Sequence, residues 1–254
     1  MDEKQLLITI CGRAGSKGFK NKNLKTFCGR QLVYYTISAI ELFKQQHPEV
    51  KADVVLNTDS IALEGLSSNY MPEIEIVHRP PRLGGDSVPK MAVFQHSLAV
   101  MEERKEKQYD YLMDLDITSP LRTDVDAWGC YETMQNRSDV DVVFSAVKSR
   151  RNPYMNMAQR VEDHVEQVIK TQFVARQQTP PCFDLNASIY VFKREFLVQN
   201  QTGFLWDGKC EMYEMEDTAV LDIDSEEDFD MMEVVARHLY ATRPEFAAVR
   251  ENIR

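Results

Sequence analysis

The chain has 254 residues, of which 43% are hydrophobic and 28% charged, and its formal net charge at pH 7 is −10. A chain of this length can bury a substantial core. The negative charge argues against nucleic-acid binding, because affinity for a phosphate backbone comes largely from clustered Lys and Arg. No apolar run approaches the roughly 20 residues of a membrane-spanning helix. The five cysteines form no Cys-x-x-Cys pair, so neither a disulfide framework nor a zinc site is predicted. We therefore predict a cytoplasmic protein with no membrane and no nucleic-acid partner.

Strand-like and helical patterns alternate along the first part of the chain. Short apolar runs rich in β-branched residues predict strands at residues 6–11, 52–56, 74–77, 111–115 and 140–147. Apolar residues at helical spacing predict helices at residues 31–43, 91–103 and 125–134. This alternation indicates an α/β fold with a doubly wound, mostly parallel sheet. Ligands of such sheets bind at the carboxyl ends of the strands, where the loop after the first strand lies.

The order loosens between residues 149 and 181, a polar stretch that contains Pro153, Pro180 and Pro181. We predict a single domain over residues 1–254, with this stretch as a small inserted lobe that serves as a dimer contact. A strand pattern resumes at residues 187–192. The last predicted helix begins after a cap at Asp224 or Ser225 and has acidic residues in its first turn.

The strongest chemical signal is the loop at residues 12–23, GRAGSKGFKNKN, directly after the first predicted strand. Five cations and no acidic residue lie between residues 13 and 25. The glycines let backbone amides approach phosphate oxygens, and the cations offset the charge of a triphosphate. The glycine spacing fits neither the Walker motif nor the dinucleotide fingerprint. The alternative is an exposed lysine-rich turn. The predicted triphosphate cradle comprises Gly12, Arg13, Ala14, Gly15, Ser16, Lys17, Lys22 and Asn23.

From this loop onward the sequence resembles the acylneuraminate cytidylyltransferases, the CMP-sialic acid synthetase family. Gly12 replaces the alanine of the family's first loop, and the rest of that loop matches. Further matches follow in order at residues 58–60, 78–83, 116–122, 176–178, 186–190 and 222–224. The resemblance implies an enzyme that couples an acidic 2-keto-3-deoxy sugar to CMP from CTP and releases pyrophosphate. It also favours a homodimer whose lobe reaches toward the partner's site.

The resemblance implies roles for residues on both sides of the nucleotide. Arg79, Asp86 and Ser87 join the first loop in binding CTP. Asp222 and Asp224 take the positions of the family's paired metal-binding aspartates, and two carboxylates one residue apart can both reach a Mg²⁺, or Mn²⁺ in its place. Capping of the last helix is the alternative for this pair. The predicted catalytic set is Arg13, Lys17, Lys22, Asp222 and Asp224.

The predicted sugar-binding set also rests on the resemblance and comprises Asp116, Thr118, Ser119, Arg176, Gln177, Asn186, Phe204 and Trp206. Arg176 matches an arginine that binds the sugar carboxylate, a task suited to its bidentate geometry. A plain turn capped by Thr123 is the alternative for the Thr118 and Ser119 hydroxyls. Core packing is the alternative for the two aromatic residues.

Four departures from the family pattern bear on the substrate. Asp116 stands where the family usually has glutamine, and it could add a metal ligand or hydrogen-bond an altered sugar. Lys90 replaces a small hydroxyl residue in the nucleotide region, Asp184 replaces an arginine, and residues 150–154 lack a lysine expected after Pro153. These changes favour another bacterial nonulosonic acid, such as legionaminic or pseudaminic acid, over N-acetylneuraminate. The alternatives are activation of Kdo or of another sugar, and a glycosyltransferase that uses residues 222–224 as its metal motif.

Overall fold

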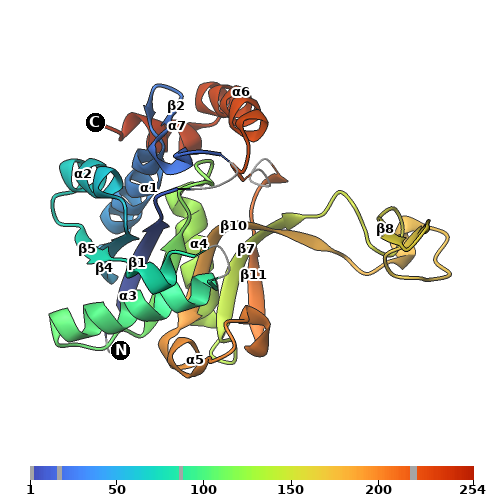
Figure 1. The fold of residues 1–254 in the computed structure, drawn as a ribbon, viewed down its shortest axis with the longest axis horizontal. Coiled ribbons are helices and arrows are strands. Elements are labelled where there is room, and N and C mark those ends of the chain that lie inside the picture. The colour runs from blue at the N-terminus through green and yellow to red at the C-terminus, as the bar shows by residue number, and fades with distance from the viewer. Residues whose placement is uncertain (1–2, 16–18, 86–87, 218–221) are drawn as a thin grey trace.

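The computed structural model describes residues 3–15, 19–85, 88–217 and 222–254 (Figure 1). Its centre is a seven-stranded sheet in the order β11-β7-β10-β6-β1-β4-β5. The strand β10 runs antiparallel to both of its neighbours, while all other pairs are parallel. The mostly parallel sheet predicted from the sequence is therefore confirmed. The strands are β1 (Gln5–Gly12), β4 (Lys51–Thr58), β5 (Glu75–His78), β6 (Tyr111–Leu115), β7 (Val142–Lys148), β10 (Phe183–Lys193) and β11 (Cys210–Glu214).

Helices cover both faces of this sheet. The helices are α1 (Leu32–Gln46), α2 (Ile61–Tyr70), α3 (Lys90–Lys105), α4 (Asp124–Asn136), α5 (Arg194–Gln199), α6 (Glu226–Thr242) and α7 (Pro244–Glu251). Alternate residues of β1 point to opposite faces: Ile8 packs with α1 and α4, whereas Leu7 packs with α3 and α5. Within the described residues, no helix combines the length and apolar character that a membrane span requires.

Capping residues fix where the helices beside the site begin. Thr123 caps α4, with its hydroxyl accepting from Asp126 N at 3.2 Å and its own N–H donating to the Asp126 carboxylate at 2.8 Å. Ser225 caps α6 in the same way with Asp228. The sequence offered either Asp224 or Ser225 as the N-cap of α6, and in the structure the N-cap is Ser225. The carboxylate of Asp224 is therefore not used for capping.

The lobe, residues 149–181, leaves the body between β7 and β10 and projects away from the sheet (Figure 1). Its far end is a small hairpin of β8 (Ala158–Val161) and β9 (His164–Gln167). Several apolar side chains of the lobe are exposed, among them Val165 at 58% and Val174 at 85%. Exposed side chains of this kind bury little apolar surface within the chain, so they add little to its stability.

Candidate active site

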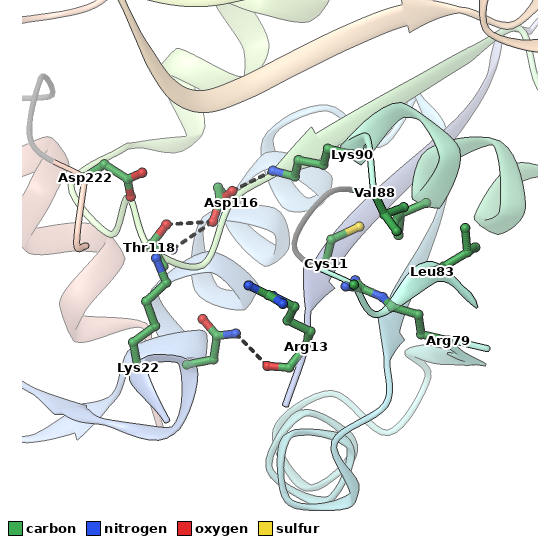
Figure 2. Close-up of a pocket in the computed structure, with 13 residues that line it drawn as sticks. Cys11, Arg13, Lys22, Arg79, Leu83, Val88, Lys90, Asp116, Thr118 and Asp222 are labelled. Carbon is green, nitrogen blue, oxygen red and sulfur yellow. Dashed lines mark hydrogen bonds and ion pairs between the residues drawn. The ribbon is translucent and has the colours of Figure 1, made fainter. Parts of the chain in front are cut away.

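A cavity of about 260 Å³ opens at the carboxyl ends of β1, β5 and β6 (Figure 2). It contains predicted residues from four separate parts of the sequence. Those that line it are Arg13, Lys22, Asn23, Arg79, Asp116, Thr118 and Asp222. Parallel strands bring these parts together, because their carboxyl ends meet at one edge of the sheet. The loop after the first strand thus lies where the sequence predicted it.

The first loop is fixed at both of its ends. A Cβ on Gly12 would lie 2.4 Å from Leu63 Cδ2 and 2.9 Å from Ile117 Cδ1, so glycine permits close packing here. Gly15 has a φ of +74°, which favours glycine. Ala14 N donates to Asp59 Oδ1 at 2.6 Å. At the other end Phe19 is buried and meets Phe229 of α6 edge to face, with 5.6 Å between ring centroids.

Part of the predicted nucleotide set falls outside the described residues. Ser16 and Lys17 of the first loop lie there, and so do Asp86 and Ser87 before α3. Their roles stay predictions.

The cations of the cavity are held by polar groups of the body. Arg79 donates from Nε to Asn57 Oδ1 at 2.9 Å and from Nη2 to Asn57 O at 3.0 Å. Asn57 in turn contacts His96 Nδ1 through its amide nitrogen at 3.2 Å. Arg13 donates from Nη1 to Gly84 O at 3.3 Å. These contacts fix the directions of both guanidinium groups before any ligand binds.

Lys22 links the first loop to the aspartates near the carboxyl end of the chain. Its Nζ lies 2.8 Å from Ile223 O and 3.0 Å from Asp224 Oδ1. Ile223 N donates to Thr118 O at 3.1 Å, which ties the same segment to the loop after β6. The basic loop and the aspartates therefore lie side by side in the fold.

Asp222 has the properties of a cation ligand. Its Oδ1 is buried and accepts no hydrogen bond from the described residues. Burial, followed by the negative charge of Asp116, raises the pKa of Asp222 above its ordinary value. A bound cation would satisfy this oxygen. No group of three or more His, Cys, Asp or Glu side chains forms a metal site among the described residues. Asp222 thus offers one unsatisfied buried oxygen to a Mg²⁺, which would take most of its other oxygen ligands from water and phosphate, whereas the Asp224 carboxylate is paired with Lys22.

Asp116 and Lys90 form an ion pair on the cavity wall (Figure 2). Asp116 Oδ2 lies 2.5 Å from Lys90 Nζ, and its Oδ1 accepts from Thr118 N at 3.0 Å and Thr118 Oγ1 at 2.9 Å. Burial opposes ionisation of Asp116, but Lys90 and the Thr118 hydrogen bonds together hold its pKa well below the ordinary value. Most of its acceptor capacity is thus occupied. Asp116 could bind a metal only by exchanging these partners.

The structure does not bring the predicted sugar residues into one cavity. Asp116 and Thr118 line the cavity described above, whereas Arg176 and Gln177 line a second cavity of about 270 Å³ at the base of the lobe. Arg176 Nη2 lies 3.4 Å from Ser149 O. The lobe therefore supplies one part of the predicted set and the sheet another.

Ser119 and Asn186 line neither cavity, since both are almost fully buried. Ser119 Oγ donates to Asn186 O at 3.3 Å. Asn186 Oδ1 accepts from Ser145 Oγ at 2.6 Å, next to the irregularity in the pairing of β10 with β7. In this structure the two side chains hold β10 against its neighbours.

Phe204 and Trp206 lie on the surface, with 65% and 62% of their area exposed. The Trp206 ring meets Phe144 of β7 edge to face at 5.5 Å between centroids. Core packing, the alternative given by the sequence, does not describe either residue. Two large exposed aromatic rings are available to a ligand or to another chain.

Sequence reasoning missed several residues of the cavity. Lys90 was noted only as a departure, yet it lines the cavity and contacts two carboxylates. One of these, Asp114, is fully buried in β6. A charged residue inside an otherwise apolar strand was the available signal for it. Asn57, which orients Arg79, ends an apolar strand in the same way.

The layout is that of a nucleotide-binding α/β enzyme, with cations and carboxylates gathered where parallel strands end. A family model described as cytidylyltransferase matches residues 7–243. The post-translational flagellin modification protein B of Campylobacter coli is 35% identical over 235 residues, which span 92% of this chain and 95% of that protein. The CMP-N,N'-diacetyllegionaminic acid synthase of Campylobacter jejuni is 34% identical over 230 residues, which span 90% and 94% respectively.

A solved structure of CMP:2-keto-3-deoxy-manno-octonic acid synthetase in complex with CTP has a similar fold. The TM-score is 0.63 at 12% identity, and the match covers 92% of this chain and 99% of that one. The chain belongs to the cytidylyltransferase family, and it is therefore a nucleotidyltransferase. The family predicted from the ordered motifs is confirmed.

Proposed function

We propose that this enzyme transfers CMP from CTP to the anomeric hydroxyl of a nonulosonic acid. The hydroxyl oxygen forms a bond to the α-phosphorus, the bond from that phosphorus to the bridging oxygen breaks, and pyrophosphate leaves with the bonding pair. The hydroxyl proton passes to solvent. The single observation that carries the proposal is the cavity that joins Arg13, Lys22 and Arg79 to Asp222. The Campylobacter jejuni relative, aligned over 94% of its length, supports the sugar class by its name.

The three cations account for the nucleotide half of the reaction. A triphosphate carries several negative charges, and developing charge on the leaving pyrophosphate is stabilised best by donors fixed in advance. Arg79 is fixed by Asn57, and Lys22 by Ile223 O. Their positioning lowers the reorganisation needed at the moment of transfer.

We also propose that Asp222 and Asp224 hold a Mg²⁺, for which Mn²⁺ can substitute. When bound, the ion would act as a Lewis acid that offsets phosphate charge. The buried Oδ1 of Asp222, which accepts no hydrogen bond from the residues that the structure describes, supports this assignment. Lys22 already contacts Asp224, so it would share that carboxylate with the ion or move toward phosphate. Calorimetry tests the assignment by measuring Mg²⁺ binding, in the absence of nucleotide, to the wild type and to Asp222→Asn.

We further propose that the enzyme is a homodimer formed through the lobe. We also propose that it is located in the cytoplasm. The exposed apolar side chains of the lobe, such as Val165 and Val174, support a partner of the same chain. Sedimentation equilibrium of the full chain checks the oligomeric state. A monomer at all protein concentrations would contradict this part alone.

Pyrophosphate release tests the reaction directly. The purified enzyme is incubated with Mg²⁺, one of the four nucleoside triphosphates and one of a panel of acidic sugars. The panel includes legionaminic acid, pseudaminic acid, N-acetylneuraminic acid and Kdo. We expect release with CTP and a nonulosonic acid. Release only with another nucleotide, or only with Kdo, would overturn the proposal.

A further inference from the structure

One ammonium group joins two carboxylates on the wall of the cavity. Lys90 Nζ lies 2.8 Å from Asp114 Oδ2 and 2.5 Å from Asp116 Oδ2. Asp114 is fully buried, and its Oδ1 accepts from Thr9 Oγ1 of β1 at 2.8 Å. Lys90 is the first residue of α3, so this contact connects α3 to β1 and β6.

Aromatic rings enclose the same ammonium. Lys90 Nζ lies 5.6 Å from the Phe94 ring centroid and 5.9 Å from that of Tyr190. Rings at this distance attract a cation. Burial lowers the pKa of Lys90, but Asp114 and Asp116 more than compensate and raise it well above the ordinary value. The two carboxylates therefore favour the charged form of the side chain.

Hydrogen-bond counting shows what this cluster can offer a ligand. An ammonium has three donors, and Asp116 accepts a hydrogen bond from one of them, while Asp114 Oδ2 is held at 2.8 Å as an ion pair without hydrogen-bond geometry. Each oxygen of a carboxylate can accept about two bonds. Oδ1 of Asp116 accepts two from Thr118, while Oδ2 accepts one from Lys90. Within the described residues, at least one donor on Lys90 and one acceptor on Asp116 remain side by side, and both residues line the cavity.

The charge of the cluster indicates which ligand groups it suits. Two carboxylates and one ammonium leave a net charge of −1, close to Asp222. Arg13 and Arg79 form a second, cationic wall of the cavity, whereas Lys22 lies beside Asp222 and Asp224. A phosphate or carboxylate is repelled by the first wall and attracted by the second. A neutral group with a donor beside an acceptor, such as a hydroxyl or an amide, fits the first.

We propose that Lys90 and Asp116 act as one unit that binds a neutral hydroxyl or amide substituent of the sugar and so selects among acidic sugars. Besides offering a donor to the ligand, Lys90 positions the Asp116 carboxylate and balances the charge of Asp114. The two side chains contact each other, so replacing one changes the surroundings of the other. This inference rests on the proposed function.

A double-mutant cycle tests the coupling. The four forms are wild type, Lys90→Ser, Asp116→Gln and the double variant, each assayed by pyrophosphate release with CTP and two sugars that differ in one substituent. Lys90→Ser leaves two neighbouring carboxylates facing the triphosphate, and we expect the KM for CTP to rise at least about tenfold. In the double variant we expect most of this rise to disappear. The ratio of kcat/KM between the two sugars should still differ from that of wild type by about tenfold or more.

A second variant and a matched control separate positioning from loss of structure. Lys90→Gln keeps a long polar side chain without charge, and it should also raise the KM for CTP. The control is Arg194 with Glu102, a part-buried ion pair at 2.7 Å that lies outside the cavity. Arg194→Ser combined with Glu102→Gln should leave both the KM for CTP and the sugar ratio unchanged.

Each outcome of the cycle decides the inference. Rescue of the KM for CTP in the double variant, with an altered sugar ratio, supports it. Additive effects, or an unchanged sugar ratio, overturn it. If wild type releases no pyrophosphate from CTP with any nonulosonic acid, the proposed function itself has failed. If the wild type does release pyrophosphate but the effects of the two substitutions are additive, only the proposal that Lys90 and Asp116 act as one unit is rejected.

Discussion

The proposed site has two halves, a nucleotide half on the sheet and a half on the lobe, and they differ in how the chain holds them. The nucleotide half stands on β1, β4 and β6, whose side chains are buried on both faces of the sheet. Its cations each have a fixed contact to the body, such as that of Arg79 with Asn57. The lobe, which carries Arg176, exposes apolar side chains and leaves the body as a projection (Figure 1). The described part of the nucleotide half is held by contacts to the body of the chain, whereas the lobe leaves apolar side chains exposed.

Matched truncations in the two regions give the largest expected difference. Ile8 in β1 is fully buried, and Val174 in the lobe is 85% exposed. Ile8→Ala should lower the free energy of unfolding by roughly 2–5 kcal/mol, because it removes buried methyl groups and leaves a cavity. Val174→Ala should change it by no more than about 0.5 kcal/mol. Urea unfolding at low protein concentration measures the free energy of unfolding of both variants. Similar decreases in the two would contradict the expected difference between the sheet and the lobe.

Loss of a single cation in the nucleotide half should reduce turnover without unfolding the protein. Lys22→Ala removes the ammonium that lines the cavity and contacts Ile223 O. We expect kcat to fall roughly 100- to 1,000-fold, the usual effect of deleting a group that stabilises developing charge. The matched control is Lys20→Ala, because Lys20 is exposed and does not line the cavity. Near-normal turnover in Lys22→Ala would remove the basis of the phosphate assignment.

The contrast between the halves also explains what the sequence could predict. The strands and longer helices of the body have clear periodicity, and the structure places them within a few residues of the predicted bounds. The shorter elements α2, α5 and β11 were missed. Strand β11 reads Cys-Glu-Met-Tyr-Glu, without a β-branched residue, and it pairs with β7 from a distance in sequence that no local pattern encodes.

Site residues divide in the same way. A motif identifies polar residues near a site, but it cannot tell those that face the cavity from those that hold the loop. Arg122 ends the motif at residues 116–122, yet it is 1% exposed and donates to Ser188 O at 2.9 Å. Thr118 in the same motif lines the cavity. Which side chain faces a ligand depends on tertiary contacts such as that of Lys90 with Asp116, and single-sequence patterns do not contain them.

The smallest predicted effect concerns acid sensitivity of the nucleotide half. Burial, together with the charges of Arg82 and Arg79, lowers the pKa of His96 below its ordinary value of 6.5. His96 Nδ1 is the acceptor for the Asn57 amide only while the ring is neutral at that nitrogen. Below pH 6.5 the unfolded chain binds this proton more readily than the folded chain, so the free energy of unfolding falls as pH decreases toward the folded pKa.

Protonation of His96 should also weaken the support of Arg79 through Asn57. We expect the KM for CTP to rise about two- to fivefold as pH drops through this window, in keeping with the loss of one hydrogen bond. His96→Gln offers an amide oxygen that accepts at all pH values, so its profile should be flatter. The matched control is His238→Gln, since His238 is exposed on α6 and distant in sequence from the cavity strands. If the profile of His96→Gln follows that of wild type, the acid sensitivity belongs to another group and the nucleotide half does not depend on the neutral ring.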